Sequence, residues 1–146
     1  MIEIIPMTEG HIDEICEIEK DCFSVPWSRD MFLEEFDRPT PAYYFIAADA
    51  GMILGYAGMW HIINEGHITN IAVRPEHRRS GIGQRLLDKL IETAMEQEMI
   101  GLTLEVRMNN TPAQGLYAKN GFKPEGIRKN YYPETREDAV IMWRYL

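Results

Sequence analysis

Two arginines and two glycines stand together where a strand pattern gives way to a helix pattern, in the order Arg78, Arg79, Ser80, Gly81, Ile82, Gly83. The first N–H groups of a helix have no partner inside it, and the helix dipole adds partial positive charge there. Glycine lets a ligand approach the backbone, so this junction could hold a pyrophosphate, with Arg78 or Arg79 adding charge. The alternative is a glycine-rich turn with two solvated arginines. The spacing matches neither the P-loop G-x-x-x-x-G-K-S/T nor the Rossmann G-x-G-x-x-G.

The strand expected before this turn, residues 68–73, carries a polar side chain among apolar ones. Asn70 shares one face of the alternating pattern with Ile68 and Ala72. A β-bulge would resolve this conflict by re-aiming a backbone N–H, and bulges are frequent next to active sites. An unpaired strand amide could then hold a carbonyl oxygen or a developing oxyanion.

Glu105 is a carboxylate in another expected strand, residues 102–107, on the face opposite to Leu104 and Val106. This strand follows a crossover helix, and parallel strands of that kind are usually buried on both faces. A carboxylate in such a buried strand requires either a partner or a function. Glu105 is therefore a candidate general base, and the alternative is an ion pair with Arg107 or with a neighbouring strand.

The elements that must position these residues begin with a strand, two helices and three antiparallel strands. Thr8 and Ser28 are suited to cap the two helices, and the residues around Pro26 separate them. The expected ranges are strand 2–6, helices to about residues 21 and 37, and strands 43–48, 52–63 and 68–73, with turns at 49–51 and 64–66.

The second half of the chain begins with a long amphipathic helix after Gly83, for which Gly101 is a suitable C-cap. The strand 102–107 must then lie parallel to the strand 68–73, through a right-handed crossover. A short helix begins at Thr111-Pro112-Ala113-Gln114, with Thr111 as its N-cap, and Gly121 ends it. The last two strands, 122–131 and 138–145, form an antiparallel pair around a loop at Pro133.

This order predicts an α/β (α+β) fold in a single domain over residues 1–146. The expected sheet is mixed and mostly antiparallel, with about seven strands, a central parallel pair and four helices. The 15 basic and 23 acidic residues give a net charge of −8, which argues against nucleic acid as the main partner but allows a small anionic cofactor. The chain has neither a basic leader nor an apolar stretch near the roughly 20 residues of a membrane span, so we expect a soluble, cytoplasmic protein without a membrane partner.

The cysteines and histidines indicate no metal site. Cys16 and Cys22 fit neither C-x-x-C nor a disulfide framework, and we interpret them as buried or idle thiols. The four histidines lack the H-E-x-x-H spacing or a comparable one. Among them, His67 could face a cleft as a proton relay, and the alternative is an ordinary strand histidine.

Several of these motifs resemble the GNAT superfamily of N-acetyltransferases. R-R-S-G-I-G after I-T-N-I-A-V is similar to its acetyl-CoA signature, Q/R-x-x-G-x-G/A, and the element order fits. More narrowly, the chain resembles the RimI-type ribosomal-protein-alanine N-acetyltransferases. That resemblance is carried by P-W-S at Trp27, L-E-V-R at 104–107, Asn110, L-Y-A-K-N-G-F at 116–122, and R-K-N-Y-Y-P followed by E-D-A-V-I-M.

The resemblance implies direct transfer of acetyl from acetyl-CoA to an α-amino group, without a metal. By this resemblance the backbone of Ile71, Ala72 and Val73 would hold the pantetheine arm and the thioester carbonyl. Asn110 would contact the same arm. The pyrophosphate would be held by Arg78, Arg79, Ser80, Gly81, Ile82, Gly83 and Gln84, where Ser80 replaces the Arg or Lys frequent in relatives.

The resemblance also implies the acid and the base. A protein amino terminus has a pKa of about 7.7–8.0, so Glu105 would remove its proton, directly or through water, before attack. Tyr117 would donate a proton to the departing thiolate and contact the cofactor. The alternative for Tyr117 is a core position, since it shares a helical stripe with Ala113 and Leu116.

The substrate side is expected to be a peptide groove walled by Trp27, Phe32, Tyr131 and Tyr132, although ordinary packing is the alternative for Trp27 and Phe32. The predicted function is acetylation of a protein N-terminus, specifically the alanine of a small-subunit ribosomal protein. The alternatives are an acetyltransferase for other N-termini, lysine or a small amine, and an acetyl-CoA-binding module without catalysis.

Overall fold

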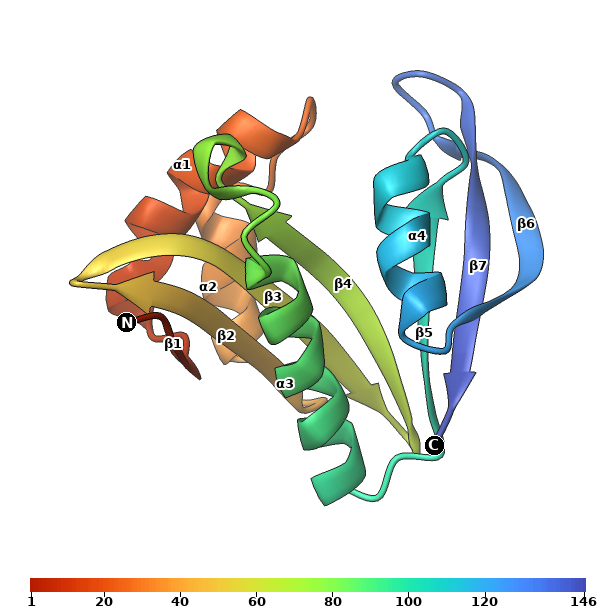
Figure 1. Ribbon diagram of the computed structural model, residues 1–146, viewed down its shortest axis with the longest axis horizontal. Helices are drawn as coiled ribbons and strands as arrows, with labels where there is room; N and C mark the ends of the chain where they lie inside the picture. Colours follow the sequence, from red (N-terminus) through yellow and green to blue (C-terminus); the bar gives the residue numbers. More distant parts are fainter.

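A seven-stranded mixed sheet carries the other elements of the chain in the computed structural model, which describes all 146 residues (Figure 1). Its strands, in the order β1-β2-β3-β4-β5-β7-β6, are β1 Glu3–Pro6, β2 Ala42–Asp49, β3 Met52–Ile62, β4 Glu65–Val73, β5 Gly101–Arg107, β6 Lys123–Tyr132 and β7 Glu137–Tyr145. The four helices are α1 Ile12–Cys22, α2 Arg29–Phe36, α3 Ile82–Glu96 and α4 Thr111–Lys119. The predicted fold class and element order are confirmed. None of the helices combines the length and the apolarity needed to span a membrane.

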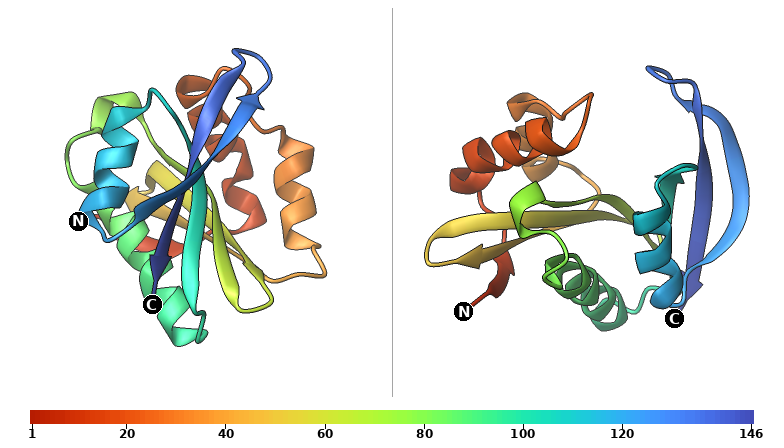
Figure 2. Two further views of the ribbon diagram at one scale, coloured as in Figure 1. Left: turned by 90° about the vertical axis from the view of Figure 1, so that its right-hand side faces the viewer. Right: turned by 45° about the horizontal axis from the view of Figure 1, so that its top comes forward.

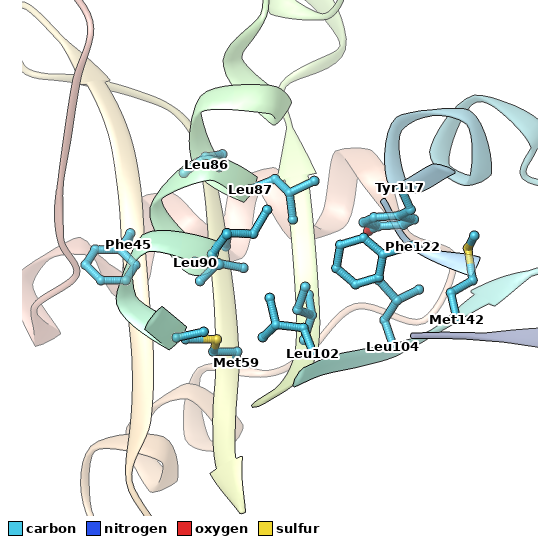
Figure 3. Close-up of a cluster of buried hydrophobic side chains, with 14 of the residues drawn as sticks. Phe45, Met59, Leu86, Leu87, Leu90, Leu102, Leu104, Tyr117, Phe122 and Met142 are labelled. Atoms are coloured by element: carbon cyan, nitrogen blue, oxygen red, sulfur yellow. The ribbon is translucent and has the colours of Figure 1, made fainter. Parts of the chain in front are cut away.

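Helices cover both faces of the sheet, and each face has its own core (Figure 2). Leu86, Leu87 and Leu90 of α3 form one core together with Met59 and Leu102, and Tyr117 and Phe122 extend this core towards α4 (Figure 3). The other core lies beneath α1 and α2 and is built from buried side chains that include Ile12, Ile15, Ile18, Phe32 and Tyr56. Burial of these apolar surfaces is the main force that fixes the helices on the sheet.

The parallel strands β4 and β5 pair over only three residues. Glu65, Gly66 and His67 face Gly101, Leu102 and Thr103, and beyond this point the strands diverge (Figure 1). Gly66 permits the close approach at the paired end, since a Cβ there would lie 2.5 Å from Leu102 Cδ2. The divergence opens the middle of the sheet, and the candidate site lies next to this opening.

The predicted bulge in β4 is present. Gly58 pairs with Asn70 and Met59 with Ile68, so Thr69 is an extra residue in β4. The bulge changes the faces that the sequence pattern indicated. Ile68 joins the core beneath α3, whereas Ala72 joins the core beneath α1 and α2. Asn70 therefore shares its face with Ala72 but not with Ile68.

Three local predictions are wrong. Gly101 does not cap α3, which ends at Glu96; Gly101 is the first residue of β5, where a Cβ would lie 3.0 Å from the Arg144 carbonyl oxygen. The N-cap of α4 is Asn110 rather than Thr111, because Asn110 Oδ1 accepts the N–H of Ala113 at 3.2 Å. The turn before β4 lies at residues 63–64, since Glu65 already pairs with β3. By contrast, the Ser28 cap of α2 is confirmed, at 3.2 Å from the N–H of Met31.

Candidate active site

A cavity of about 760 Å³ opens between the C-terminal end of β4, the start of α3 and the face of α4 that carries Ala113, Leu116 and Tyr117. It contains every residue predicted to hold the cofactor except Ser80. The sequence-predicted residues in its lining are Ile71, Ala72, Val73, Arg78, Arg79, Gly81, Ile82, Gly83, Gln84, Asn110 and Tyr117. Residues from three separate stretches of the chain are therefore brought together as expected.

The turn before α3 has the backbone conformation of an anion site. Arg79 and Gly81 both lie in the left-handed region, at φ 65° and 82°, and α3 begins at Ile82. A Cβ on Gly81 would meet no atom within 4 Å, so the space above these amides is open. Successive N–H groups in such a turn converge on an anion, and the helix dipole supports them. The residues present thus fit a pyrophosphate.

The cations of this cavity differ in part from those expected. Arg78, an exposed residue of the cavity lining, is engaged by the protein itself: its Nε donates to the Val73 carbonyl oxygen at 3.2 Å and its Nη2 lies 3.4 Å from Cys22 Sγ. Ser80 also points away, because its Oγ donates to the His77 carbonyl oxygen at 2.5 Å. Arg79 and Lys119 line the cavity. Lys119 was missed, although a lysine in the last turn of the helix after Asn110 is a basic residue on the correct element.

Two other cavity side chains are already engaged within the protein. Asn110 uses its Oδ1 as the cap of α4, which leaves the Nδ2 group to donate to a ligand. Gln84 Nε2 donates to Asp88 and Asn120, each at 2.7 Å, so its side chain braces α3 against α4. Cys22 was taken for an idle thiol, yet it lines the cavity. No signal in its sequence context could have placed it there.

Tyr117 lies at the border between the core and the cavity, so its predicted core position is confirmed, and its role as an acid stays a prediction. Its ring is 8% exposed and packs against Phe122, with 5.7 Å between ring centroids, as part of the core beneath α3 (Figure 3). It also lines the cavity, and its hydroxyl makes no hydrogen bond within the chain. Burial raises the pKa of Tyr117 well above that of an ordinary tyrosine, so the hydroxyl is a proton donor at neutral pH.

Glu105 lies on β5 two residues beyond the last β4–β5 pair, where the strands begin to separate. Its side chain is 8% exposed, and His67 Nε2 lies 3.0 Å from its Oε2. On the other oxygen, Oε1, the Tyr131 hydroxyl donates at 3.3 Å and Arg128 Nε lies at 3.9 Å. The hydrogen bond from His67, helped by the nearby positive charge of Arg128, lowers the pKa of Glu105 below that of an ordinary glutamate despite its burial.

The alternative for Glu105 was an ion pair with Arg107 or with a neighbouring strand. The pair with Arg107 is wrong, whereas His67 on the neighbouring strand β4 does contact the carboxylate. Arg107 instead holds the β6–β7 loop, with its Nη1 3.1 Å from Glu137 Oε1, its Nη2 bonded to Glu134 and its guanidinium 3.9 Å from the centre of the Tyr132 ring. Burial raises the pKa of Tyr132 to about 12. The clamp fixes the C-terminal end of β6, from which Tyr131 reaches Glu105. The role of Tyr131 and Tyr132 as groove walls stays a prediction.

Of the two N-terminal residues predicted to wall a peptide groove, Phe32 is a core residue, and the role of Trp27 stays a prediction. Phe32 is 1% exposed and packs between Trp27 and Tyr56, so it belongs to the core and not to a groove wall. Trp27 is half-buried, and its backbone N–H donates to Glu19 Oε1 at 2.8 Å. Glu19 also accepts the Tyr56 hydroxyl at 2.6 Å, and burial raises the pKa of this carboxyl. This buried contact ties the α1–α2 loop to the sheet.

Comparison with known proteins places the site in a family. A family model described as "Acetyltransferase (GNAT) family" matches residues 12–122. A protein of Bacillus subtilis (strain 168), named "putative ribosomal protein bS18-alanine N-acetyltransferase", is 44% identical over 132 residues, which cover 90% of this chain and 87% of that one.

Solved structures agree with this result. The ribosomal-protein-S18-alanine N-acetyltransferase from Escherichia coli has a TM-score of 0.91 and 33% identity, over 99% of this chain and 94% of that chain. An N-acetyltransferase from Thermoplasma acidophilum in complex with coenzyme A shares the fold, with a TM-score of 0.87 and 19% identity, over 100% of this chain and 99% of that chain. The resemblance found in the sequence motifs is confirmed, and the chain belongs to the acetyltransferase (GNAT) family.

Proposed function

We propose that the protein transfers acetyl from acetyl-CoA directly to the N-terminal amine of a protein, specifically the N-terminal alanine of ribosomal protein bS18. The observation that carries this proposal is the opening between β4 and β5. A phosphate-binding turn and a protonated tyrosine line the cavity next to it, and an ionised carboxylate lies at the point where it begins.

The cavity residues have separable tasks towards the donor. Bound acetyl-CoA supplies the acetyl group as a thioester. The amides at the start of α3, with Arg79 and Lys119, bind and neutralise its pyrophosphate. The backbone of residues 71–73 faces the opening because β4 has left its partner β5, so its polar groups can bind the pantetheine arm. The Tyr117 hydroxyl can give its proton to the departing sulfur.

Glu105 acts on the amine. An N-terminal amine has a pKa of about 7.7–8.0 and reaches the site mostly as an ammonium ion. Because Glu105 has a lowered pKa, its carboxylate is ionised at neutral pH and is a weak base. We therefore assign it to binding the ammonium and directing the proton to water, after which the amine lone pair is free to attack.

The choice of substrate is supported by the names of the relatives. Two proteins that are 44% and 33% identical to this chain, each over most of its length, are named as alanine N-acetyltransferases for the ribosomal protein S18. A ribosomal substrate also favours a cytoplasmic location. Tyr131 and Tyr132 at the clamped end of β6, and the half-buried Trp27, could contact the peptide that follows the alanine.

The test is acetylation of a bS18 peptide that begins with alanine, beside the same peptide with a blocked N-terminus. Mass spectrometry should locate one acetyl group on the α-amine of the free peptide and none on the blocked one. Equal acetylation of both peptides would show that the acceptor is a lysine side chain and not the N-terminal amine. Calorimetry with acetyl-CoA is run in parallel, because binding without turnover on any peptide would indicate a non-catalytic module.

A further inference from the structure

His67 and Glu105 connect β4 to β5 at the start of the opening. His67 belongs to the last β4–β5 pair, opposite Thr103, and its Nε2 is 3.0 Å from Glu105 Oε2. The two side chains are 27% and 8% exposed. No backbone pairing connects the two strands beyond this point, so this side-chain contact is the next link between them.

The contact fixes which histidine nitrogen carries hydrogen. Glu105 is ionised at neutral pH, and an ionised carboxylate only accepts hydrogen bonds. His67 must therefore donate from Nε2, which leaves Nδ1 as the nitrogen that gains a proton when the ring becomes charged. The Trp60 ring packs edge-on against the imidazole, with 5.7 Å between the ring centroids, and limits its rotation.

Charged groups on the surrounding elements define what a protonated His67 would do. On β6, Arg128 Nε lies 3.9 Å from Glu105 Oε1, and Tyr131 donates to the same oxygen. Glu35 on α2 and Arg38, which follows the end of α2, contact Trp60: the indole N–H donates to Glu35 Oε1 at 2.5 Å and the Arg38 guanidinium lies 4.1 Å from the ring centre. Arg38 and Glu35 also form an ion pair with each other at 3.1 Å. Glu105 is thus the carboxylate nearest to His67.

We propose that His67 is a positioning residue that holds Glu105 at the mouth of the opening and, when it becomes an imidazolium, competes with the substrate ammonium for that carboxylate. This inference rests on the proposed function, since it assigns the control of amine binding at the same site. With a neutral His67, Oε1 of Glu105 keeps a full negative charge for the incoming amine. With a charged His67, the pair is neutralised and Arg128 adds repulsion. Acid should therefore weaken peptide binding beyond the effect of protonating the peptide itself.

The variants His67→Gln and His67→Ala separate two effects of His67: the hydrogen bond that holds Glu105, and the charge that the imidazole ring gains in acid. Glutamine can donate from its amide N–H but does not titrate, whereas alanine does neither. At pH 8, His67→Gln should keep kcat within about threefold of the wild type, and His67→Ala should lose roughly ten- to hundredfold in kcat/KM, the usual effect of losing a hydrogen bond to a charged group. His61→Gln is the matched control, because His61 lies on β3 against Tyr43 and away from Glu105.

The decisive readout is the ratio of the kcat/KM values of wild type and His67→Gln between pH 5.5 and pH 8.5. Amine protonation affects both proteins equally and cancels. If the imidazolium competes, the ratio should fall by about tenfold towards acid pH, chiefly through a rise in the wild-type KM for the peptide. A constant ratio would overturn the proposal, because a purely structural His67 would change the level of activity but not its pH profile.

A second measurement does not depend on turnover. Nitrogen-15 NMR of the free protein at pH 8 should show the His67 hydrogen on Nε2. Hydrogen on Nδ1 would exclude the contact and overturn the proposal even if the enzyme acetylates bS18. If the Nε2–H form is found and no peptide is acetylated, the proposed function fails instead.

Discussion

Glu105→Gln removes one negative charge from a site that is almost closed to solvent. Three side chains interact with the carboxylate. His67 and Tyr131 donate hydrogen bonds to it, and Arg128 lies close enough to attract it by charge. A glutamine amide has one acceptor oxygen, so it can satisfy one side and must present N–H groups to the other. The variant therefore loses the attraction for the ammonium and one of its own hydrogen bonds.

The expected loss follows from these contacts. A hydrogen bond to a charged group contributes about 1.5–3 kcal/mol, which is roughly 10- to 150-fold in peptide affinity. Guiding the proton away from the amine contributes roughly 10²–10⁴ in rate. The two effects overlap, because both use the same carboxylate, so we expect a decrease in kcat/KM of roughly 10³.

The assay measures coenzyme A release with an alanine-starting bS18 peptide at pH 8. Glu125→Gln is the control, an identical change at an exposed position on β6. The affinity for acetyl-CoA, measured by calorimetry, should be unchanged in both variants, since neither residue lines the cavity. If Glu105→Gln keeps kcat/KM within about threefold of the wild type while it folds normally, the assignment of Glu105 to the amine is refuted.

Further predictions concern the cavity and the buried contacts. Tyr117→Phe keeps the ring against Phe122 and should lower kcat by roughly 10² or more with an unchanged coenzyme affinity; undiminished turnover would assign Tyr117 to the core alone. Gly81→Ala and Gly51→Ala both place a Cβ at φ 82° in open space, so each should lose roughly 1–2 kcal/mol of unfolding free energy, yet only Gly81→Ala should weaken coenzyme binding, by about tenfold in calorimetry. Equal coenzyme affinities would place the pyrophosphate elsewhere. Tyr56→Phe leaves Glu19 Oε2 without its donor and should lower the free energy of unfolding in urea by about 1–3 kcal/mol, whereas Tyr145→Phe at an exposed position should not.

Local features of the site could be predicted because they depend on neighbouring residues. The left-handed turn at Gly81 and the start of α3 are determined by a few residues in sequence, and the conflict around Asn70 correctly indicated a bulge. The parallel placement of β5 followed from the helix between it and β4. In each case the pattern itself limited the possible backbone conformations.

Contacts between distant segments could not be predicted in the same way. The partner of Glu105 depends on the register of β4 against β5, which the close approach at Gly66 sets in three dimensions. The sequence left open whether Phe32 walls a groove or packs in the core, because its neighbours Trp27 and Tyr56 lie in other elements. Arg78 carries the expected charge, but its side chain donates to the Val73 carbonyl oxygen. This contact depends on the path of the folded backbone and could not be inferred from the sequence.

The three-residue contact between β4 and β5 also has a consequence for the lifetime of the protein. Few backbone hydrogen bonds join β4 to β5. A molecule bound in the opening between them would therefore add contacts to the strands on both sides at once. A ligand at 100 times its dissociation constant stabilises the folded state by about 2.7 kcal/mol. The supply of acetyl donor would then govern how much enzyme survives proteolysis as well as how fast it works, which links the amount of this modifying enzyme to the metabolic state of the cell.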